Sequence, residues 1–142
     1  MKYNLKKISG DASFREFYRL KKNNKSSIIV SSKKEKFKNL AVYAVINKVF
    51  NNNRINAPKL LSNYYKNGII EISDLGEKSF YDHVISKKNK LNSYKLLIKL
   101  LIKIQKIKVK KYYKFQNLKI KIPKYTLSNL HKESDLFFDW YL

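Results

Sequence analysis

The chain contains no cysteine among its 142 residues. This excludes disulfide bonds and thiolate metal sites, and it fits a reducing compartment. The most apolar stretch, residues 91–109, is broken by lysines every few positions, so it cannot span a bilayer. No apolar segment typical of a signal peptide follows Met1. We therefore expect a cytoplasmic protein with no membrane partner.

Arginine is scarce although the chain is strongly basic. The formal net charge is +22, yet the only arginines are Arg15, Arg19 and Arg54. Proteins that read base edges or hold buried phosphates favour arginine for the fork geometry of its guanidinium. Here lysine, spread over every segment, is enriched together with asparagine, isoleucine and tyrosine, as an AT-rich coding sequence would produce. Coding bias thus explains the charge better than a nucleic-acid partner. The alternative is a lysine-rich module that binds nucleic acid or an anionic membrane.

Apolar residues make up 44% of the chain, enough for one domain with a core. Five short segments have the composition of strands. Small polar turns separate the first three, and an Asn-Gly turn separates the last two, which is a strong hairpin signal. The predicted strands cover residues 3–8, 14–20, 26–32, 59–65 and 69–73.

Helical spacing of apolar residues predicts a helix over residues 35–51, able to cover one face of a sheet. Ser32 is expected to cap this helix, with Glu35 as its capping-box partner. After residue 76 the sequence predicts only helices, which start near Ser79, at residue 91 and at residue 127, and an irregular extended connector over 112–123. Strands followed by helices favour an α+β fold over a parallel doubly wound sheet.

Three segments resemble one enzyme family. Gly-Asp-Ala-Ser-Phe-Arg at 10–15, with Tyr-Arg-Leu at 18–20, resembles the phosphate-loop hairpin of the kinase-like aminoglycoside phosphotransferase family. Within that family it is most similar to bacterial kinases that phosphorylate the anomeric hydroxyl of N-acetylmuramate and N-acetylglucosamine. Glu-Ile-Ser-Asp-Leu-Gly at 71–76 resembles the hinge, and Asp-Leu-Phe-Phe-Asp-Trp-Tyr-Leu at 135–142 resembles a later helix.

The resemblance implies a fold and a ligand. Residues 1–76 would form a kinase-like amino-terminal lobe with its hinge, a five-stranded antiparallel sheet plus one packed helix. Residues 77–142 would begin a helical carboxy-terminal lobe, truncated here. The nucleotide partner would be ATP, with magnesium only in an intact version, and a sugar would bind only if a carboxy-terminal half completes the protein.

The resemblance also indicates which residues would bind the nucleotide. A turn of small residues leaves backbone N–H groups open to phosphate, although an ordinary hairpin turn is the alternative. Asp11 would cap that turn through its own backbone. The hinge backbone would meet adenine, with Ile28 or Ile72 against its face. These assignments give Gly10, Asp11, Ala12 and Ser13 as the phosphate cradle and Ser73, Asp74 and Leu75 as the hinge contacts.

The cation expected on the phosphates has several candidates. A kinase-like Val-Ala-x-Lys pattern would place lysine where this chain has Ser31, and Lys33 and Lys34 follow closely. Arg15 or Arg19 would supply the charge instead, unless both are solvated strand residues. Glu35, the sole acid between Glu16 and Glu71, would either pair with this cation or only cap the helix.

The catalytic loop of the family, a His-x-Asp with an asparagine five residues beyond the aspartate, has no counterpart in the sequence. His83 is followed by Val84-Ile85 and His131 by Lys132-Glu133. Asp74-Leu75-Gly76 is not the metal-binding Asp-Phe-Gly, because no catalytic loop precedes it. We therefore predict no catalytic residue and no metal ligand here. The chain would be the front part of a sugar kinase, inactive alone, whose remainder is truncated, encoded separately or lost.

Overall fold

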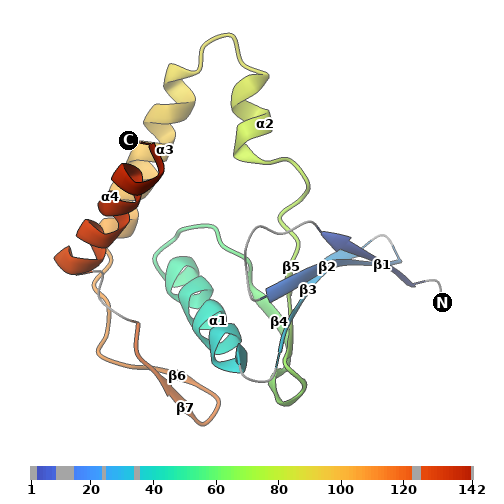
Figure 1. Cartoon of the computed structure of the whole chain (residues 1–142). Helices are drawn as coiled ribbons and strands as arrows, with labels where there is room; N and C mark the ends of the chain where they lie inside the picture. The colour runs from blue at the N-terminus through green and yellow to red at the C-terminus, as the bar shows by residue number, and fades with distance from the viewer. Residues whose placement is uncertain (1–2, 9–14, 24, 34–35, 123–125, 142) are drawn as a thin grey trace.

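The computed structural model describes residues 3–8, 15–23, 25–33, 36–122 and 126–141. Five antiparallel strands form its main sheet in the order β1-β2-β3-β5-β4 (Figure 1). The five strands are β1 (Tyr3–Ile8), β2 (Arg15–Lys22), β3 (Lys25–Ser32), β4 (Leu60–Tyr64) and β5 (Ile69–Ser73). The predicted α+β fold with a five-stranded antiparallel sheet is confirmed, and it is consistent with a kinase-like amino-terminal lobe.

A tight connection joins β4 to β5. A 3-10 turn, η2 (Tyr65–Asn67), ends at Gly68, whose φ is +69°. A Cβ at Gly68 would lie 2.6 Å from the Ser32 carbonyl oxygen, and the Ser32 N–H donates to the Gly68 carbonyl at 3.0 Å. Glycine is therefore required both for its left-handed backbone and for the close approach of β3.

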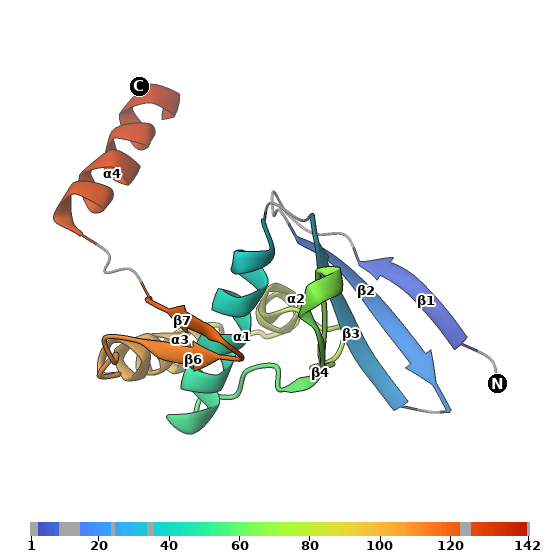
Figure 2. The ribbon, with the colours of Figure 1, turned by 90° about the horizontal axis from the view of Figure 1, so that it is seen from below.

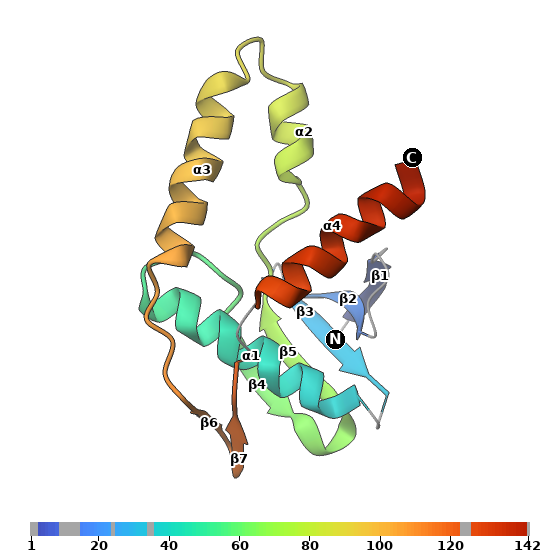
Figure 3. The ribbon, with the colours of Figure 1, turned by 60° about the vertical axis from the view of Figure 1, so that its left-hand side comes forward.

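Helix α1 (Phe37–Asn52) covers one face of the sheet (Figure 3). Its small and branched side chains pack against the strand residues that alternation directs to the same face. The shared core comprises Leu40, Ala41, Ala44, Val45 and Val49 of α1 with Ile28, Val30, Ile70 and Ile72 of the sheet. The packing of this helix on the sheet is thus as predicted.

The start of α1 differs from the prediction. Its N-cap is Lys36, which makes no side-chain cap hydrogen bond. Ser32 instead lies at the end of β3, so the predicted Ser32 cap is wrong, and Glu35 lies outside the described residues. Because β3 continues through Ser32, the chain reaches α1 four residues later than a Ser32 cap would require.

The segment predicted as an irregular connector, residues 112–123, contains a β-hairpin, so that prediction is wrong. Strands β6 (Tyr113–Phe115) and β7 (Leu118–Ile120) pair antiparallel, and Gln116 takes a φ of +50° at the turn. Phe115 and Ile120 are buried in the core beside α1. The ring of Phe115 meets that of Tyr65 edge-on, with centroids 5.4 Å apart.

The remaining helices extend from this unit (Figures 1 and 2). Helix α2 (Phe80–Ile85) begins with a capping box between Ser79 and Asp82, which confirms the predicted start near Ser79. Helix α3 (Leu91–Gln105) is four residues shorter than predicted and exposes most of its apolar side chains. Helix α4 (Leu127–Tyr141) stands apart from the sheet (Figure 2). In the described parts of the chain, no helix combines the length and apolarity needed to cross a membrane.

Candidate functional site

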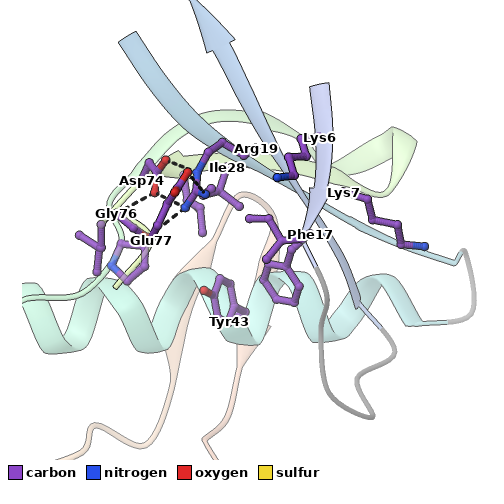
Figure 4. A pocket seen from close by; sticks show the side chains of 13 residues that line it. Lys6, Lys7, Phe17, Arg19, Ile28, Tyr43, Asp74, Gly76 and Glu77 are labelled. Atoms are coloured by element: carbon purple, nitrogen blue, oxygen red, sulfur yellow. Dashed lines mark hydrogen bonds and ion pairs between the residues drawn. The ribbon is translucent and has the colours of Figure 1, made fainter. Parts of the chain in front are cut away.

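A cavity of about 630 Å³ opens between the first three strands, α1 and the segment that leaves β5 (Figure 4). Pockets for small ligands typically measure about 300–1,000 Å³. The apolar side of the cavity is formed by Ile28 and Ile72, both nearly buried, and by Phe17 and Tyr43, whose rings meet edge-on with centroids 6.3 Å apart. These side chains offer a flat aromatic or heteroaromatic ligand an apolar surface.

The segment 74–77, which we call the hinge segment because it overlaps the predicted hinge, also lines the cavity. Leu75 within it is exposed, and no described residue hydrogen-bonds to its backbone N–H or C=O. Ser73 behaves differently, because its N–H donates to the Lys59 carbonyl and its hydroxyl accepts from the Lys59 N–H, both at 2.8 Å. Of the predicted hinge residues, Leu75 therefore has backbone groups open to a ligand, whereas Ser73 is bonded to Lys59, just before β4.

Arg19 of β2 binds the hinge segment at several points. Its Nε donates to Asp74 Oδ2 at 2.6 Å and its Nη2 to Asp74 Oδ1 at 3.2 Å. Nη2 also donates to the Gly76 carbonyl at 2.9 Å, and Nη1 to Glu77 Oε1 at 2.8 Å. The interpretation of Arg19 as a solvated strand residue is wrong, since the Arg19 and Asp74 side chains are only 13% and 9% exposed.

The Asp74 carboxylate accepts hydrogen bonds from Arg19, Ser26 and Gly76. The Arg19 guanidinium holds the pKa of the Asp74 carboxyl well below its usual value, and hydrogen bonds from the Ser26 hydroxyl and the Gly76 N–H lower it further. The same contact raises the pKa of Arg19. Both groups are therefore charged throughout the physiological range. We call Arg19, Ser26, Asp74, Gly76 and Glu77 the Arg19 cluster.

Arg15 is the first residue of β2, next in sequence to the predicted phosphate loop. Its guanidinium carbon is 4.7 Å from the centroid of the Tyr43 ring, within the range of a cation–π interaction. Ser31 occupies the position where the kinase-like pattern would have a lysine. It directly follows Val30, which is fully buried beneath α1, so the Ser31 side chain lies on the other face of the sheet. Gly10, Asp11, Ala12 and Ser13 lie outside the described residues, as Glu35 does.

The structure thus brings Arg19, Asp74 and Leu75 together with Ile28 and Ile72 in one cavity. Sequence reasoning missed the roles of Phe17, Tyr43 and Glu77. Phe17 could have been found, because it lies two residues from both Arg15 and Arg19 along β2 and so shares their face of the sheet. Within the described ranges, no three acidic or histidine side chains gather where they could hold a metal ion.

Comparison with known proteins gives one similar protein among those that are curated. No protein-family model matches the sequence, and no solved structure matches it either. Among curated proteins, the chain is similar to an N-acetylmuramate/N-acetylglucosamine kinase of Pseudomonas aeruginosa, at 25% identity over 134 residues. The match covers 94% of this chain and 36% of that protein. The chain is therefore distantly related to a sugar kinase and spans little more than a third of its length.

Proposed function

We propose that this chain is the nucleotide-binding part of an ATP-dependent kinase of the aminoglycoside phosphotransferase family. The complete enzyme would phosphorylate the anomeric hydroxyl of an amino sugar. The main support is the cavity that joins an apolar surface, Ile28 and Ile72, to the open backbone groups of Leu75. The similarity to the Pseudomonas aeruginosa kinase supports the same assignment.

In this proposal adenine lies against Ile28 and Ile72, and its polar edge meets the Leu75 backbone. The apolar surface excludes water, while the backbone groups give the base its orientation. The triphosphate extends along β2 toward Arg15 and the loop of Gly10, Asp11, Ala12 and Ser13, where the small residues leave room for backbone N–H donors. Magnesium would be held by a part of the complete enzyme other than the described residues.

A pair of variants in β3 tests this assignment. Ile28 lines the cavity, whereas Val30 packs on the same face of the same strand without lining it. Ile28→Ala is expected to weaken binding of Mg-ATP about fivefold, the effect of losing about 1 kcal/mol of apolar contact. Val30→Ala, the control, removes two side-chain carbons where Ile28→Ala removes three, and it should change affinity less than about twofold because Val30 does not line the cavity. Titration calorimetry at low temperature on folded variants measures both, and equal losses would contradict the proposal.

A second expected outcome concerns catalysis. The sequence has no His-x-Asp loop, and phosphoryl transfer depends on a positioned base and metal-held phosphates. The 142-residue chain alone is therefore expected to give no ADP release with N-acetylmuramate or N-acetylglucosamine in a coupled assay. A catalytically active sugar kinase serves as the positive control. Turnover above background would show that the chain supplies its own base.

One observation favours a second candidate function, electrostatic binding of nucleic acid. Another cavity of about 630 Å³, between α1 and residues 108–114, is lined by four lysines and two tyrosines, and its described lining contains no acid. These lysines are Lys48, Lys108, Lys110 and Lys114. Tight RNA binding that falls steeply with salt, and that charge reversal of Lys108 and Lys110 abolishes, would favour this candidate over the kinase.

A further inference from the structure

We propose that Arg19 is a positioning residue of the nucleotide site. Its guanidinium fixes the hinge segment against β2. The backbone N–H and C=O of Leu75 are thereby held where they can hydrogen-bond to the polar edge of a bound adenine. This inference rests on the proposed function. It assigns Arg19 to the base end of the site and not to the phosphates.

The bonds of Arg19 match the shape of its side chain. Nε and Nη2 bind the two oxygens of Asp74, Nη1 reaches Glu77, and Nη2 also reaches the Gly76 carbonyl. A planar guanidinium can point donors in all these directions at once, whereas an ammonium is a point charge on a flexible stem. Replacing Arg19 by lysine would keep the charge and lose the simultaneous contacts.

The hinge segment has few other anchors. Leu75 is 58% exposed and the Glu77 side chain 69% exposed, so neither is held by packing. Gly76 has a φ of +102°, and a Cβ built on it would meet no atom within 4 Å. Glycine is therefore needed there for its backbone conformation, and in that conformation the Gly76 carbonyl accepts from Arg19 while its N–H donates to Asp74. The Arg19 cluster thus sets the path of the chain on both sides of Leu75.

The position of Arg19 along β2 separates it from the phosphate end. Arg19 pairs with Ile28 of β3 and Lys6 of β1, whereas Arg15 pairs with Ser32. Four residues of strand separate the two arginines by about 13 Å. A nucleotide whose phosphates reach the loop beside Arg15 would therefore place its base, and not its phosphates, near Arg19.

The test compares two ligands on the full 142-residue chain. Arg19→Lys is expected to weaken binding of ATP about tenfold and to leave binding of inorganic tripolyphosphate, which has no base, unchanged within about twofold. Titration calorimetry gives both affinities. Equal loss for the two ligands would mean that Arg19 contacts phosphate, and unchanged ATP affinity would mean that it positions nothing; either result overturns the inference.

Three controls distinguish positioning from general damage. Arg54→Lys makes the same substitution outside the cavity and should change neither affinity. Asp74→Asn should reproduce the selective loss of ATP affinity, and adding it to Arg19→Lys should cause little further loss, because both variants break one unit. Amide exchange at Gly76, whose N–H donates to Asp74, should be faster in Arg19→Lys. If ATP fails to bind the unaltered chain, the proposed function falls and the inference with it; if ATP binds and Arg19→Lys is silent, only the inference falls.

Discussion

Leu40→Ala is expected to lower the free energy of unfolding by about 2–5 kcal/mol. Leu40 is fully buried on the face of α1 that packs on the sheet, among Ile28, Val30 and Ile70. Truncation removes its apolar contacts and leaves a cavity, because a helix seated on a sheet can move only partly to fill it. Urea unfolding followed by circular dichroism measures the change.

The control for this prediction is Leu130→Ala in α4. Leu130 is 51% exposed, so the same chemical change should alter the free energy of unfolding by less than about 0.5 kcal/mol. If Leu40→Ala costs no more than Leu130→Ala, α1 does not pack on the sheet as described. The kinase-like arrangement of the amino-terminal unit would then be wrong.

Phe115→Ala is expected to cost about 3–5 kcal/mol. Phe115 lies in the β6–β7 hairpin, far along the chain from the sheet, yet it is buried in the same core and meets the Tyr65 ring. Its loss should therefore unfold the whole unit more easily and should not merely loosen the hairpin. Urea unfolding tests this, together with hydrogen exchange at β3 amides.

Tyr81→Ala, at an exposed position of α2, is the control for Phe115→Ala and should have little effect. Protection lost only in β6 and β7 would show that the hairpin is peripheral.

The sheet and α1 could be predicted because their signals are local. Alternation at Ile28 and Val30, the Asn-Gly turn that ends at Gly68, and the apolar stripe of α1 each depend on neighbours within a few residues. The β6–β7 hairpin could not be predicted in the same way. Its strands have three residues each, too few for a clear alternation, and Phe115 and Ile120 are fixed by packing against α1, which is more than sixty residues away by the chain numbering.

The candidate site, too, could be predicted only where the signal is local in the sequence. The resemblance at residues 71–76 covers most of the hinge segment, and Ile28 and Ile72, the two candidates for contact with adenine, line the same cavity as that segment. The adenine contact itself stays a prediction. The partner of Arg19 could not be predicted, because the contact joins residues 55 positions apart in sequence. Its formation depends on the register that places Arg19 opposite Ile28. A solvated arginine and one bonded to the hinge segment look the same in the sequence of a strand.

The most direct test of the nucleotide-binding proposal is a titration of ¹⁵N-labelled protein with Mg-ATP, followed by amide chemical shifts at two salt concentrations. We predict the largest shifts at Ile28, Ile72 and the hinge segment, and we predict that they persist at high salt, because apolar and backbone contacts are little screened. Shifts confined to residues 108–114, around the lysine-lined cavity, that vanish as salt is raised would contradict the account.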